Sequence, residues 1–168
     1  MEHIWSPWRY KYIEAADRQG VCVFCRAAES EKDDENYVAY RGKFNFVILN
    51  LYPYTSGHLM IVPYEHTGSL ASVNEATTTE MMNLAKRAQT ALEAEYHPEG
   101  FNIGMNLGRS AGAGVADHIH LHVVPRWVGD ANFVSTIGET RVLPEDLATT
   151  LEKLKKHFDE KQSDRETV

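Results

Sequence analysis

Three histidines alternate with apolar residues in the second half of the chain: His118, His120 and His122. In an extended strand, alternate side chains share a face, so these imidazoles would line one surface while the aliphatic residues between them pack against the other. A core face is a poor place for them, because every buried ring nitrogen needs a hydrogen-bond partner. The spacing therefore indicates chemistry at this strand.

Two kinds of chemistry fit such a row. The histidines could chelate one metal ion, as in a mononuclear zinc hydrolase or a cupin-like oxygenase. The oxygenase would need a nearby carboxylate ligand, and the next acidic residues are Asp130 and Glu139. Alternatively, one neutral imidazole attacks phosphorus near neutral pH while its neighbours orient it. The loop before the row, residues 106–114, favours this second chemistry because its glycines let backbone N–H groups approach phosphate oxygens.

A Cys-x-x-Cys pair at Cys22 and Cys25 is the second chemical feature. Haem attachment is excluded, because Arg26 and not histidine follows the pair. Two thiolates are half of a tetrahedral zinc site, which needs two more nitrogen or sulfur ligands. The alternative is a pair of small buried thiols.

The elements that must position these residues are short strands and two helices. Period-two patterns predict strands at Tyr37–Tyr40, Phe44–Leu49, His58–Val62, Phe101–Met105 and His118–Pro125. Apolar residues spaced three and four apart predict helices over Asn74–Tyr96 and Leu143–Phe158. Strands in runs with one long helix and one C-terminal helix indicate an α+β fold with a mainly antiparallel sheet.

Composition and net charge exclude further classes of function. The 168 residues carry 17 Lys and Arg against 24 Asp and Glu, a net charge of −7, which argues against general nucleic-acid binding but not against a small phosphorylated ligand. Apolar runs are too short to span a membrane, and the first residues do not resemble a signal peptide. We expect a cytoplasmic protein of one domain, residues 1–168, with an N-terminal arm at 1–20 and a frayed tail at 162–168.

The chain resembles the histidine triad (HIT) family of nucleotidyl transferases and hydrolases. The family motif, His-φ-His-φ-His-φ-φ with φ apolar, is met throughout residues 118–124, and the resemblance continues upstream at 46–50 and 57–63. Segments 5–9 and 125–133 are similar to the branch that includes diadenosine tetraphosphate phosphorylases. The resemblance implies a HIT-like fold and a homodimer whose sheets join.

The resemblance also implies roles for individual residues. His120 would attack the α-phosphate to form a nucleotidyl-histidine, and His122 would hydrogen-bond the phosphate or the leaving group. Asn50 matches the ribose ligand, with Ile48 and Phe46 near the base, and Asn106 lies on the phosphate side. Many relatives carry Gln shortly before the first histidine, whereas this loop has small residues there. The expected phosphate-binding groups are therefore in the loop: Arg109, Ser110, Gly112 and Gly114.

Relatives such as the galactose phosphate uridylyltransferases imply a structural zinc ion on Cys22, Cys25, His66 and His118. His58 is expected to be a hydrogen-bonding neighbour, or else to replace His66. The expected substrates are a dinucleoside polyphosphate and inorganic phosphate, and phosphorolysis would release ADP. Two alternatives stay open: hydrolysis of dinucleoside polyphosphates or nucleoside phosphoramidates to AMP, and a regulator that binds nucleotide without turnover.

Overall fold

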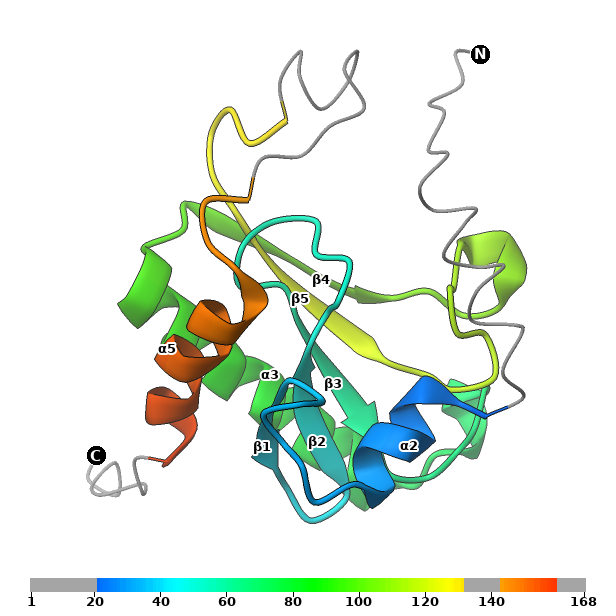
Figure 1. Ribbon diagram of the computed structural model, residues 1–168. Coiled ribbons are helices and arrows are strands. Elements are labelled where there is room, and N and C mark those ends of the chain that lie inside the picture. The colour runs from blue at the N-terminus through cyan, green and yellow to red at the C-terminus, as the bar shows by residue number, and fades with distance from the viewer. Residues whose placement is uncertain (1–20, 132–142, 160–168) are drawn as a thin grey trace, which may run out of the picture.

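A five-stranded antiparallel sheet in the order β1-β2-β3-β5-β4 is the centre of the fold (Figure 1). The computed structural model describes residues 21–131 and 143–159, so the expected arm at 1–20 and tail at 162–168 lie outside it. The strands are β1 Val38–Arg41, β2 Asn45–Leu49, β3 Leu59–Pro63, β4 Gly100–Met105 and β5 Leu121–Arg126. The helices are α2 Val23–Glu29, α3 Glu75–Tyr96 and α5 Leu147–Asp159, with short 3-10 turns η1 Leu70–Ser72 and η2 Arg109–Ala111.

The inner strand β2 is buried at every position because helices cover both of its faces. Val47 and Leu49 point into the main core with residues of α3 and α5, whereas Phe46 and Ile48 pack in a smaller core with α2. Alternation along the strand therefore separates the two cores. Figure 1 shows α3 and α5 together beside the sheet and α2 lying apart from them.

The helix α3 confirms the sequence prediction almost to the residue. Asn74 is its N-cap and accepts a hydrogen bond from the backbone of Thr77 at 2.9 Å. The apolar stripe from Met81 to Leu92 is buried in the main core. Within the described residues, no helix combines the length and apolar character needed to cross a bilayer.

The short helix α2 has no counterpart in the sequence prediction. Its last turn is held from outside by Arg41 of β1, whose guanidinium donates to the carbonyl oxygens of Ala27, Ala28 and Ser30 and to the carboxylate of Asp33. These are the carbonyls that a helix C-terminus leaves without partners. Long-range capping therefore fixes a seven-residue helix that is too short to show a clear apolar period.

Two predicted boundaries are wrong. The strand expected at His118–Pro125 begins only at Leu121, because the preceding backbone bonds to a loop: Ile119 N–H donates to Thr67 O at 2.8 Å. The helix expected from Leu143 begins at Leu147, because Asp146 caps it through the Thr149 N–H at 2.8 Å. Only the last histidine of the triad therefore lies within a strand.

Candidate functional site

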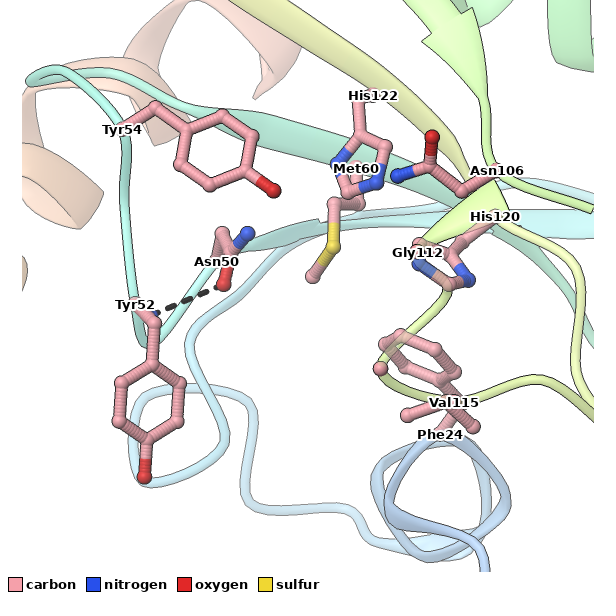
Figure 2. A pocket seen from close by; sticks show the side chains of 11 residues that line it. Phe24, Asn50, Tyr52, Tyr54, Met60, Asn106, Gly112, Val115, His120 and His122 are labelled. Carbon is pink, nitrogen blue, oxygen red and sulfur yellow. Dashed lines mark hydrogen bonds between the residues drawn. The ribbon is translucent and has the colours of Figure 1, made fainter. Parts of the chain in front are cut away.

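A pocket opens where the triad leaves the sheet and the glycine-rich loop folds over it (Figure 2). It encloses about 480 Å³ of empty space, its open mouth included. Its walls combine polar side chains with aromatic and aliphatic ones, as small-molecule sites commonly do. The lining residues are Phe24, Asn50, Tyr52, Tyr54, Met60, Asn106, Gly112, Gly114, Val115, His120 and His122.

The imidazole of His120 is held in one tautomer. Its Nδ1 lies 2.9 Å from the carbonyl oxygen of His118, which can only accept, so Nδ1 carries the proton. Burial lowers the pKa of His120, and the bond to His118 only partly offsets this, so the neutral ring is favoured at pH 7. The remaining nitrogen, Nε2, then carries a lone pair, which is what a nucleophile at this pocket needs.

The neighbouring His122 is oriented by a chain of hydrogen bonds that starts at the backbone. Tyr54 N–H donates to Nδ1 of His58 at 3.1 Å, so the proton of His58 is on Nε2. That Nε2 lies 2.9 Å from Nδ1 of His122, which must accept, so the proton of His122 is on its own Nε2. The chain thus leaves His122 as an N–H donor, with its ring 4.8 Å from that of His120.

Asn50 closes the polar side of the pocket. Its Oδ1 accepts from the backbone N–H of Tyr52 at 2.9 Å (dashed in Figure 2), and its amide nitrogen lies 3.4 Å from Nδ1 of His58. Across the pocket, the amide of Asn106 points toward His122 (Figure 2). Amides on both sides of the two imidazoles can therefore bind hydroxyl or phosphate oxygens of a ligand.

Four side chains converge at the start of α2 to form a cluster that could hold a metal: Cys22, Cys25, His66 and His118. Their ligand atoms all lie within 4.8 Å of one another. The Nδ1 of His118 lies 3.3 Å from the sulfur of Cys22, and the Nδ1 of His66 lies 3.2 Å from that of Cys25. Two sulfurs and two nitrogens at this spacing match a closed tetrahedral site.

The surroundings of the cluster also fit a metal. Nε2 of His118 lies 2.8 Å from the carbonyl oxygen of Pro63, so Nε2 carries the proton and Nδ1 presents its lone pair to the sulfurs. Burial and the neighbouring Cys22 raise the pKa of Cys25 to about 11, so two thiolates this close need a cation to offset their charge. The donor set therefore fits a soft or borderline divalent ion.

Phe24 connects the metal cluster to the pocket. It belongs to α2, between the two cysteines in sequence, and its ring lies 5.4 Å edge-on from His118 and 5.0 Å from His120. The same ring lines the pocket. The side chain of His118 belongs to the cluster, and its carbonyl oxygen accepts a hydrogen bond from Nδ1 of His120. The cluster is therefore joined to His120 by two contacts, this hydrogen bond and the ring of Phe24.

Comparison with known proteins agrees with this arrangement. The family model described as the HIT domain matches residues 31–128. The chain belongs to the HIT family. It is 39% identical to an AP-4-A phosphorylase of Mycobacterium tuberculosis over 157 residues, covering 89% of this chain and 80% of that protein.

Other HIT proteins are also similar. A Zn-bound histidine triad family protein from Mycobacterium smegmatis superposes with a TM-score of 0.66 at 32% identity, covering 82% of this chain and 92% of that one. An adenosine 5′-monophosphoramidase of Saccharomyces cerevisiae is 28% identical and covers 69% of this chain and 69% of its own length. These matches confirm the HIT fold expected from the sequence.

The HIT site contains only part of the expected ligand-binding set. Gly112 and Gly114 line the pocket together with the two asparagines described above. Phe46 and Ile48 lie in the small core behind the pocket instead of on its lining. Arg109 and Ser110 form the exposed turn η2 and are not among the lining residues. Arg109 and Ser110 as phosphate ligands therefore stay a prediction.

Sequence reasoning did not assign Phe24, Met60 or Val115 to the pocket. Met60 occupies the position on β3 that faces the same core as Phe46, and Val115 follows the glycine loop. A signal existed for Met60, because it lies two residues after His58 and so shares a face with it if the strand is extended. No such signal existed for Phe24, because its helix was not predicted.

Proposed function

We propose that this HIT protein transfers an adenylyl group from a dinucleoside polyphosphate, such as diadenosine tetraphosphate, to inorganic phosphate. The observation that carries the proposal is the fixed tautomer of His120, which presents an Nε2 lone pair to a pocket suited to a nucleotide. The 39% identity to an AP-4-A phosphorylase supports this substrate and favours phosphorolysis over release of AMP.

In the first step, Nε2 of His120 attacks the α-phosphorus, and the bond from that phosphorus to the bridging oxygen breaks. ATP leaves, and the adenylyl group is held on the histidine by a P–N bond. His122, whose Nε2–H is set by the chain through His58, donates to an oxygen of the phosphate or of the departing group. This donation stabilises charge that develops as the bridging bond breaks.

In the second step, an oxygen of inorganic phosphate attacks the same phosphorus, the P–N bond breaks, and ADP leaves. His120 regains its neutral form with a lone pair on Nε2. We expect the backbone N–H of Gly114, together with Asn106, to hold the nonbridging oxygens, and Asn50 to bind the ribose hydroxyls, since the N–H of Gly112 already donates to Arg109 O at 2.9 Å. Phe24, Met60 and Val115 supply apolar surface for the base.

The metal of the cluster is proposed to be a structural zinc ion, held by Cys22, Cys25, His66 and His118. The Zn-bound relative from Mycobacterium smegmatis supports this choice, as does the set of two sulfur and two imidazole ligands. All four positions of such a site are filled by protein, so its contribution is to fix α2 and its Phe24 against the triad.

We also propose a homodimer formed through β4. This strand ends the sheet order, and within the described residues it pairs only with β5. Its Ile103 was expected on a half-buried face but is 43% exposed, which leaves apolar surface along an unpaired edge. Pairing with a second copy would cover both. The cytoplasmic location and the single domain remain predictions, with which the two free cysteines are compatible.

Product analysis tests the proposed reaction. The protein is incubated with diadenosine tetraphosphate with and without inorganic phosphate, and the nucleotides are separated chromatographically. We expect ADP and ATP, formed only when phosphate is present. AMP and ATP regardless of phosphate would identify a hydrolase that uses the same histidine. No product in either tube would contradict adenylyl transfer from this substrate.

A further inference from the structure

A second groove adjoins the nucleotide pocket and is not explained by the binding of one nucleotide. It encloses about 920 Å³, its open side included, and shares Tyr54, Asn106 and His122 with the first pocket, whereas His120 lines only the first. The groove follows β4 and β5 away from the triad, toward Asn102 and Arg126. A ligand that spans both hollows would therefore pass His122 at its middle.

The far end of the groove carries a guanidinium held in a fixed orientation. Arg126 donates from Nε to Asp130 at 2.6 Å and from a second nitrogen to the same carboxylate at 2.7 Å, and it also donates to Oδ1 of Asn102. The Asp130 side chain is only 12% exposed, whereas that of Arg126 is 41% exposed. The less exposed carboxylate of Asp130 thus fixes the orientation of the guanidinium. A guanidinium has five N–H groups, and these three bonds use three of them, so the others can donate to a ligand.

The side on which the leaving group departs also favours the second groove as its binding site. In a displacement at phosphorus, the leaving group departs on the side opposite the nucleophile. His120 lines only the first pocket, whereas Asn106 and His122 line both, so a departing group directed away from His120 has the second groove open to it. There the phosphate chain would meet the N–H groups of Arg126, and the base would meet the apolar side chains of Met105 and Val124.

We propose that this groove binds the departing nucleoside polyphosphate and that Arg126 contacts its phosphates. The inference rests on the proposed adenylyl transfer and adds to it a second subsite. The charged groups that line the groove are Arg126, Asp130 and the titratable His122. Because Asp130 is paired with Arg126, a polyphosphate meets the guanidinium and the N–H of His122 more directly than it meets the carboxylate.

The test compares two adenylyl donors. Diadenosine tetraphosphate carries a second nucleotide, whereas the leaving group of adenosine 5′-(4-nitrophenyl phosphate) is small and activated and has no phosphates for Arg126 to contact. The variants are Arg126→Gln and the double change Arg126→Gln with Asp130→Asn, which leaves no unpaired carboxylate. Lys86→Gln, on an exposed position of α3, removes the same charge elsewhere as a matched control.

We expect both Arg126 variants to lose about 10- to 100-fold in kcat/KM for diadenosine tetraphosphate, the effect of one or two charge-assisted hydrogen bonds, and to keep activity on the nitrophenyl donor. Equal losses on both donors, no loss on either, or a loss shared by Lys86→Gln would overturn the inference. If the unmodified protein transfers adenylyl from neither donor, the proposed function itself fails and the inference falls with it.

Discussion

His58 offers a sharp test of how the triad is oriented, because its Nε2 bonds to His122 while its Nδ1 faces the Tyr54 backbone and the Asn50 amide. It is 1% exposed, and its Nε2–H is the donor that fixes the tautomer of His122. Replacement by Met keeps the approximate volume and removes the donor. Replacement by Gln keeps an amide N–H close to where Nε2 lies, so the matched pair separates the hydrogen bond from the packing.

The expected magnitude follows from the bond that is lost. Without its donor, Nδ1 of the half-buried His122 loses this hydrogen bond, which costs about 1 to 3 kcal/mol. If this cost is added to the activation free energy, because His122 must be correctly oriented in the transition state, kcat drops by about 5- to 150-fold. We expect this drop for His58→Met and a much smaller one for His58→Gln.

The assay is steady-state formation of ADP from diadenosine tetraphosphate at saturating phosphate. Binding of AMP and the midpoint of thermal unfolding are measured on the same preparations, to show that the pocket and the fold persist. If the Met variant keeps full activity, or if the Gln variant is as impaired as the Met variant, then the hydrogen bond to His122 does not orient it for catalysis.

Three further predictions concern the metal, the fold and the dimer. Cys25→Ser should lower zinc affinity by more than about 100-fold, since loss of an outer partner alone costs about 10- to 100-fold; competition with a chromogenic chelator measures this, and unchanged affinity would contradict the cluster. Burial would raise the pKa of Glu80, but hydrogen bonds from Asn45 and the backbone N–H groups of residues 43–45 lower it overall. Glu80 therefore adds stability above its unfolded pKa that is lost as the pH falls through the lower folded value. Denaturant unfolding should show Glu80→Gln to be less stable by about 1 to 3 kcal/mol at pH 7, with a gap that narrows below about pH 4; a constant gap would refute the linkage. Ile103→Asp should halve the mass found by sedimentation, and an unchanged mass would place the dimer contact elsewhere.

Sequence patterns predicted the elements whose stability is local or repeats along the chain. The helix α3 has a cap at Asn74 and a regular apolar stripe, so its bounds can be predicted from the sequence. The helix α2 depends on Arg41 and on the cluster at its first turn, contacts that join residues far apart in the chain. Local patterns cannot contain that information.

The site was predictable to the extent that the family motif contains it. The motif pointed to His120, and the resemblance named the four residues of the cluster that could hold a metal, which the structure brings together. The pocket wall was less predictable, because Phe46 and Ile48 face the small core and the apolar lining comes from α2, β3 and the loop between β4 and β5. Where a side chain points in a two-sided sheet depends on which helix covers each face, and that follows only from the assembled fold.

The central claim is that His120 carries the adenylyl group. The most direct measurement mixes the protein with diadenosine tetraphosphate in the absence of phosphate, stops the reaction with alkali to preserve the phosphoramidate, and maps the modified peptide by mass spectrometry. We predict an adenylyl group on His120 that disappears when phosphate is added before the quench, with ADP formed in its place. Turnover without any adduct in wild type, or continued turnover in His120→Asn, would contradict the account.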